Sequence, residues 1–218
     1  MPVNELNPAM NRLNPYVSAP VLVTEPSTSD IAIVVCGGGN PFAEYEQAMA
    51  LVRASGKQHR VFAGNDQIEH FPDHLHDAVT LHPDKLPRWL ERRTFAGRSS
   101  PERIWSHRNT GGRNTHWTKD WAGSTGLFCV KIAREQGFTH IILCGVHMSP
   151  ESDHFVRKTP WNAATGFMRG WLGHMTELKP YIRSFGGWTE RQFGRPDLPW
   201  VVADIEENYS VAPTGVRA

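Results

Sequence analysis

The continuous apolar run at residues 31–36, which ends in three consecutive glycines, constrains the fold more than any other feature of the sequence. A strand that is apolar on both sides is typical of a parallel sheet covered by helices on both faces. Residues 42–55 then have the pattern of a helix, with Pro41 near the first turn and Gly56 just after the last. Together these features predict a strand, a tight glycine turn and a helix in direct succession.

The same alternation of strand and helix patterns continues along the chain. Further strands are predicted at residues 59–63, 78–81, 103–106, 139–144 and 181–185. Further helices are predicted at residues 86–93, 124–136 and 161–178. Because parallel strands need crossover connections, this order predicts an α/β fold: a three-layer, Rossmann-like arrangement with a mostly parallel sheet and helices on both faces.

Irregular segments flank the predicted Rossmann-like nucleotide-binding domain, which we place at residues 30–194. Residues 1–29 are rich in Pro, Asn, Ser and Thr and have no hydrophobic periodicity. We interpret them as an arm that is loose or packs on another chain, which would allow a homo-oligomer. Residues 195–218 form a similar tail, in which residues 200–202 could add a short strand.

The composition argues against several classes of partner. Lys and Arg number 23 against 22 for Asp and Glu, so no charge imbalance points to nucleic acid or a membrane surface. There is no signal-peptide pattern, and no apolar stretch approaches the roughly 20 residues of a membrane span. The three cysteines lie in apolar runs without a CxxC pair, which is typical of small buried hydrophobes in a reducing compartment. We therefore expect a cytoplasmic protein without a membrane span.

The turn after the first strand, formed by Gly37, Gly38, Gly39 and Asn40, is the first candidate binding element. Glycines permit close approach of the backbone to a ligand, and the N-terminus of the following helix offers free N–H groups to an anion. The turn is neither a complete G-x-G-x-x-G nor a Walker loop. It predicts a nucleotide or phosphate site, and the alternative is a tight turn without a ligand.

Polar side chains at the start of one predicted helix and at the end of the second predicted strand are further candidates for ligand binding. Ser124, Thr125 and Gly126 open a helix, where the hydroxyls either cap the helix or hold a phosphate or ribose. Asn65 follows the second strand, where it either reads a base or ribose hydroxyl or occupies a left-handed turn. Arg113 belongs to a basic loop that favours an anionic ligand or is simply solvated.

The loop after the strand at residues 139–144 supplies the candidate catalytic group. His154 lies there near carboxylates and could act as a general base near neutral pH. Arg157 and Lys158 could neutralise a departing phosphate. The alternative is a mobile polar loop.

A metal site is not expected. His70, His74 and His76 lie close together with Asp73 and Asp77, but this spacing has no strongly helical context, and a surface loop is the favoured interpretation. The sequence has no Asp-x-Asp motif, the device with which many sugar transferases hold a metal and a diphosphate. We therefore expect no metal and no other cofactor.

Residues 124–146 resemble a segment shared by family-42 sialyltransferases and by proteins similar to 6-hydroxymethylpterin diphosphokinase. In both groups a Ser/Thr-Ser-Gly turn opens a helix that ends in Gly-Tyr or Gly-Phe, and a strand follows that closes in Gly-Ile/Val-Asp. Here Thr125 replaces the middle serine and His147 replaces the closing aspartate. The resemblance covers residues 31–190 in element order and about 25 residues in detail.

The resemblance implies roles for individual residues. Asn65 falls where the sialyltransferases carry a nucleotide-contacting asparagine. Their catalytic histidine lies before the last helix, where His154 is the nearest candidate and His174 a weaker one.

Three functions follow as hypotheses. The first is metal-independent transfer from a nucleotide-sugar donor to an acceptor that the sequence does not identify. The second is ATP-dependent diphosphate transfer. The third is a non-catalytic nucleotide-binding or assembly protein built on the same fold.

Overall fold

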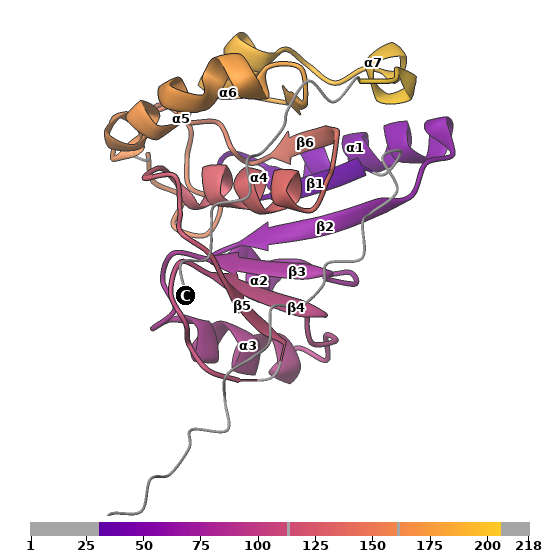
Figure 1. Ribbon diagram of the computed structural model, residues 1–218. Coiled ribbons are helices and arrows are strands. Elements are labelled where there is room, and N and C mark those ends of the chain that lie inside the picture. Colours follow the sequence, from indigo (N-terminus) through magenta and orange to yellow (C-terminus); the bar gives the residue numbers. More distant parts are fainter. Residues whose placement is uncertain (1–30, 113, 161, 206–218) are drawn as a thin grey trace, which may run out of the picture.

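The computed structural model describes residues 31–112, 114–160 and 162–205, which contain one seven-stranded parallel sheet. The strand order is β5-β4-β3-β2-β1-β6-β7 (Figure 1). The strands are β1 (Ile31–Val35), β2 (His59–Gly64), β3 (Asp77–Thr80), β4 (Arg103–Ser106), β5 (Thr115–Trp117), β6 (His140–Cys144) and β7 (Ile182–Ser184). The predicted Rossmann-like α/β architecture is confirmed.

Helices cover both faces of the sheet, as the alternation of patterns predicts. One face packs against α4 (Thr125–Glu135), α5 (Ala164–Leu178) and α6 (Gly187–Phe193). The other face packs against α1 (Pro41–Ser55), α2 (Gln67–His70), α3 (Leu86–Phe95) and α7 (Leu198–Val202). Figure 1 shows α4 in front of the sheet and α1 behind it.

The residues of β1 show why its sequence is apolar throughout. Ile31, Ile33 and Val35 pack in the same cluster as the side chains of α1, whereas Ala32 and Val34 pack in the cluster that contains α4. Successive side chains of a strand point to opposite faces, and all five are fully buried. A central strand with helices on both sides needs an apolar residue at every position.

The order of the strands reverses beside β1. β2 to β5 follow one another on one side of β1, while β6 and β7 lie on its other side. The connection after β1 leads to α1 on one face, and the connection after β6 leads to α5 on the other. The loops at the two carboxyl ends therefore diverge and leave a crevice, the usual position of a ligand site in a doubly wound sheet.

The possible strand at residues 200–202 is wrong, because these residues belong to helix α7. The carboxylate of Asp197 accepts a hydrogen bond from the Trp200 N–H at 2.9 Å, and Pro199 occupies the first turn. Val201 is fully buried in the cluster that contains α1. Three consecutive apolar residues fit a helix as well as a strand, so the N-terminal cap and the proline decide the outcome.

Three short elements occur in segments without a predicted strand or helix: β5, α2 and α6. β5 lies in a polar, glycine-rich stretch, where the ring of His116 stacks on Trp105 of β4 with centroids 4.6 Å apart. A strand of only three residues, Thr115, His116 and Trp117, is too short to show a hydrophobic alternation in the sequence. Its pairing with β4 depends on a tertiary contact.

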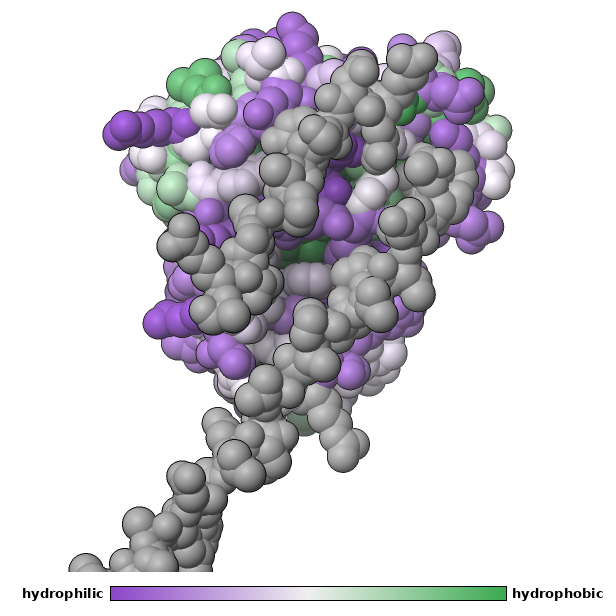
Figure 2. Space-filling view, in the orientation of Figure 1, coloured by the Kyte–Doolittle hydropathy of each residue, from purple (hydrophilic) through white to green (hydrophobic). Residues whose placement is uncertain are grey.

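The visible surface is mostly hydrophilic, with separate hydrophobic areas over α5 and α7 (Figure 2). The exposed apolar side chains of these helices are Phe167, Leu172, Leu198 and Val202. Among the described residues, no helix is long and apolar enough to cross a lipid bilayer.

Candidate functional site

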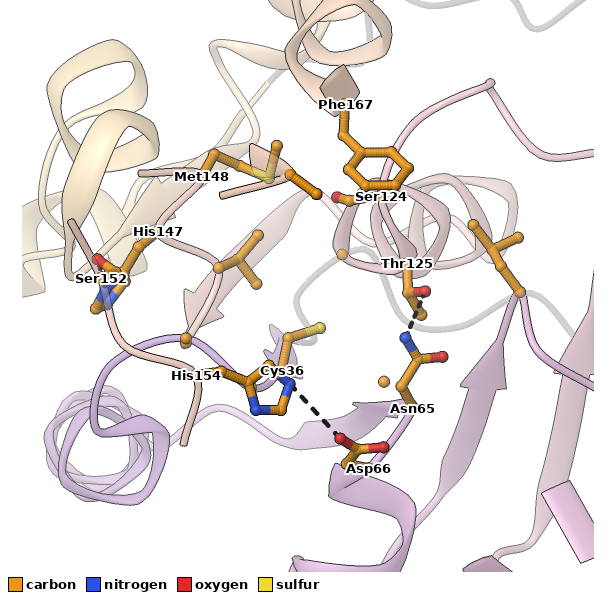
Figure 3. Close-up of a pocket in the computed structure, with 18 of the residues that line it drawn as sticks. Cys36, Asn65, Asp66, Ser124, Thr125, His147, Met148, Ser152, His154 and Phe167 are labelled. Atoms are coloured by element: carbon orange, nitrogen blue, oxygen red, sulfur yellow. Dashed lines mark hydrogen bonds and ion pairs between the residues drawn. The ribbon is translucent and has the colours of Figure 1, made fainter. Parts of the chain in front are cut away.

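A pocket of about 470 Å³ lies at the carboxyl edge of the sheet, in the crevice beside β1. Its walls come from the loops after β1, β2, β3 and β6 and from the N-terminal ends of α4 and α5 (Figure 3). The predicted site residues that line it are Gly37, Gly38, Asn65, Ser124, Thr125, Gly126, His154 and Arg157. Segments far apart in the sequence thus meet in one cavity.

Gly37 and Gly38 form the floor of the pocket where β1 ends. The Gly38 N–H donates to the carbonyl of Gly145, after β6, at 2.8 Å. A Cβ at Gly38 would lie 2.9 Å from that carbonyl oxygen, and a Cβ at Gly37 would lie 2.9 Å from Nε2 of His154. Glycine is required here because backbone and imidazole approach more closely than a side chain would permit.

Gly39 and Asn40, the other half of the predicted turn, are not among the lining residues. Gly39 has a left-handed φ of 58°, and its N–H donates to the carbonyl of Asp153 at 2.8 Å. The side chain of Asn40 caps α1 by accepting the Ala43 N–H at 3.3 Å. These two residues shape the turn, and Gly37 and Gly38 face the pocket.

Two hydrogen bonds fix the side chain of Asn65, which follows the carboxyl end of β2. Its Nδ2 donates to Thr125 Oγ1 at 2.9 Å (Figure 3), and its Oδ1 accepts from Thr80 Oγ1 at 3.0 Å. Its φ of 53° is left-handed, which asparagine tolerates better than most residues. The amide therefore connects β2, β3 and α4, and the Thr125 hydroxyl keeps its proton for a ligand.

Ser124 caps α4 and also faces the pocket. Its Oγ accepts the Leu127 N–H at 3.3 Å and the indole N–H of Trp171 at 3.1 Å. With both acceptor positions used, its hydroxyl proton is free to donate to a ligand. The capping role and the ligand-binding role are therefore compatible. The backbone N–H groups of the first helical turn point the same way and favour an anion.

His154 packs across the glycine turn (Figure 3). Nε2 lies 3.5 Å from Oδ2 of Asp66, and Nδ1 accepts the backbone N–H groups of Val156 at 3.2 Å and Arg157 at 3.4 Å. Burial lowers the pKa of His154 below its usual value, and the charge of Arg157 lowers it further. The neutral ring therefore carries its proton on Nε2, where it can donate a hydrogen bond.

The predicted cations divide into three cases. Arg157 lines the pocket, where it is joined by Lys85, which the sequence did not single out. Lys158 lies outside the pocket wall, with its ammonium 4.5 Å from the centroid of the Phe155 ring. Arg113 lies outside the described residues. Arg157 and Lys85 thus supply the positive charge for an anionic ligand.

A second polar group at the pocket centres on His147, which stands in the polar loop that the sequence singles out but to which the sequence assigns no role. His147, after β6, donates Nε2–H to Oε1 of Glu44 at 2.6 Å and faces Ser152 Oγ through Nδ1 at 2.8 Å. Glu44 of α1 also accepts the Gly145 N–H at 2.7 Å. The replacement of aspartate by His147 was the only signal, since Glu44 and Ser152 belong to no recognisable motif.

The histidines near residue 75 lie at the opposite, amino edge of the sheet. His74, His76 and Glu102 could together offer three ligand atoms to a metal ion, whereas His70 is not part of this group. However, Nδ1 of His76 accepts the Val61 N–H at 3.1 Å, and an Arg60 nitrogen lies 2.8 Å from the Glu102 carboxylate. With Nδ1 occupied, Nε2 of neutral His76 carries the proton and offers no lone pair. The hydrogen bonds fit a structural network better than a metal centre.

Comparison of the chain with protein-family models, curated proteins and solved structures finds no match. The resemblance of residues 124–146 therefore remains a prediction from the sequence. Since the fold alone does not determine a reaction, the function has to be argued from the pocket.

Proposed function

We propose that this protein is a nucleotide-dependent transferase that binds a nucleotide-activated donor in the pocket beside β1. The observation that carries the proposal is the convergence of the glycine turn, the N-terminus of α4 and two cationic side chains on one cavity. Free N–H groups at a helix start and cationic side chains are suited to phosphate, the glycines allow the backbone to approach closely, and the cavity lies at the topological switch point of the sheet. The resemblance to family-42 sialyltransferases favours a nucleotide sugar as donor.

The lining residues suggest how the donor would lie. Backbone N–H groups at the start of α4, with the hydroxyls of Ser124 and Thr125, would bind phosphate oxygens. Arg157 and Lys85 would balance the phosphate charge. Phe167, above Ser124 in Figure 3, offers an aromatic face to the base or sugar.

The hydrogen bonds of His154 favour one of its two possible roles. A general base needs an unprotonated nitrogen near the acceptor, but Nδ1 already accepts two backbone N–H groups. Nε2 carries the proton beside Gly37 and Asp66. We therefore assign His154 to stabilising the phosphate leaving group by hydrogen bonding, and the acceptor would lose its proton to another group.

Calorimetric titration tests this proposal with CMP-N-acetylneuraminate, UDP-glucose and ATP, each with and without Mg²⁺. We expect binding of a nucleotide sugar without metal. Arg157→Ala should weaken it about 10- to 100-fold, because hydrogen bonds to charged groups contribute about 1.5–3 kcal/mol. Arg88→Ala, at an exposed position on α3, should leave affinity unchanged.

Other outcomes of the titration separate the three hypotheses. Binding of ATP alone, and only with Mg²⁺, would favour diphosphate transfer. Binding without turnover for any acceptor would favour a non-catalytic protein. Failure of all three nucleotides to bind would contradict the proposal.

A further inference from the structure

The hydrogen bonds of His147 arrange three side chains in the order carboxylate, imidazole and hydroxyl. Glu44 Oε1 lies 2.6 Å from His147 Nε2, and His147 Nδ1 lies 2.8 Å from Ser152 Oγ. The carboxylate fixes the proton on Nε2, so the lone pair of Nδ1 faces the serine hydroxyl. A nucleophile, a base and a group that orients the base within hydrogen-bond distance form the arrangement that activates serine in many enzymes.

His147 is fixed in place by its surroundings. Its side chain is 12% exposed and that of Glu44 is 11% exposed. A Cβ at Gly186 would lie 2.5 Å from Nε2, and a Cβ at Gly39 would collide with Cε1. The glycines leave room for one orientation of the ring, and a base held in one orientation loses little entropy during a reaction.

The serine is accessible to a small molecule. Ser152 is half-buried and lines the pocket together with His147 (Figure 3). Met148 follows His147 with a left-handed φ of 48°, a strained conformation for a residue with a side chain. Within the described chain its N–H has no acceptor, and Met148 also lines the pocket. A backbone N–H without an acceptor, in a residue that lines the same pocket as Ser152, is available to a developing oxyanion.

We propose that Ser152 is a nucleophile and His147 its general base, which gives the pocket an esterase activity independent of the nucleotide. Ser152 Oγ attacks the carbonyl carbon of an ester while its proton passes to His147 Nδ1. The C–O bond to the leaving alcohol then breaks, and the alcohol takes that proton. Water hydrolyses the acyl-serine by the same route, which releases the carboxylic acid and restores the serine.

The lining of the pocket indicates the class of ester. Val146, Met148 and Phe167 offer an apolar surface for a short acyl chain. The cations Arg157 and Lys85 favour a leaving alcohol that carries negative charge. An ester of a short carboxylic acid with an anionic alcohol fits both parts of the wall.

Covalent labelling tests this proposal without the natural substrate. The full-length protein is incubated with a fluorophosphonate probe, and the modified residue is identified by peptide mass spectrometry. We expect one adduct, on Ser152, and a burst of 4-nitrophenol from 4-nitrophenyl butyrate. Ser152→Ala should abolish both, and His147→Gln should slow labelling about 10²- to 10⁴-fold, the usual contribution of a general base.

Ser149→Ala is the matched control, because this neighbouring hydroxyl pairs with Glu151 and not with a histidine. It should label at the rate of the unmodified protein. Absence of a Ser152 adduct in the unmodified protein, or an unchanged labelling rate in His147→Gln, would overturn the proposal. Because labelling needs no nucleotide, its outcome is separate from that of the nucleotide titration.

Discussion

At the scale of single residues, His140 couples stability to pH. It is almost completely buried at the start of β6, and its Nε2 lies 3.0 Å from the Trp200 carbonyl of α7. Burial, and then the charge of Lys57, lowers its pKa from 6.5 to about 4. As pH falls through 6.5 the unfolded chain binds a proton that the folded chain does not, so the folded state loses stability until about pH 4.

Because His140 titrates differently in the folded and unfolded states, we expect the melting temperature of the protein to depend on pH. Between pH 7 and pH 5 the melting temperature should fall, and it should fall less for His140→Gln, which removes the titrating group. Part of the fall should remain in the variant, because burial also lowers the pKa of His76 to about 4. Thermal unfolding of both proteins at the two pH values checks this, and equal falls would contradict the role of His140.

At the scale of secondary-structure elements, two of the three glycines of α5 have opposite roles. Gly170 is buried where α5 crosses the segment before α4, and a Cβ there would lie 2.8 Å from the carbonyl oxygen of Ala122 and from the Cα of Gly123. Gly173, one turn later, has open space around it. Gly170 thus permits a close helix–backbone contact beside the pocket, whereas Gly173 only adds flexibility to the helix.

Alanine at these two positions should change stability in opposite directions. Gly170→Ala should lower the free energy of unfolding by about 1–3 kcal/mol, because backbone atoms must move apart. Gly173→Ala should raise it by about 0.5–1 kcal/mol, the usual gain in a helix interior. Urea unfolding of the two variants provides the comparison, and two equal effects would show that the contact at Gly170 does not constrain α5.

At the scale of the whole molecule, the sequence predicts six of the seven strands and several of the residues that line the pocket. The long apolar runs predict β1 and β6, and the glycines and hydroxyls at the element ends predict the pocket wall, because the carboxyl ends of parallel strands share one edge. The hydrogen bond between Glu44 and His147 could not be predicted from the sequence. The two residues are 103 positions apart, and Glu44 is one of two acidic residues on α1.

The position at which a nucleotide binds distinguishes the pocket beside β1 from every other part of the protein. Hydrogen–deuterium exchange is measured with and without CMP-N-acetylneuraminate, UDP-glucose and ATP. We expect a bound nucleotide to slow exchange in residues 36–38, 64–66 and 123–126 and in the loop after β6, because these segments line the pocket. Slowed exchange confined to α3 or to the amino edge of the sheet would contradict a nucleotide site beside β1.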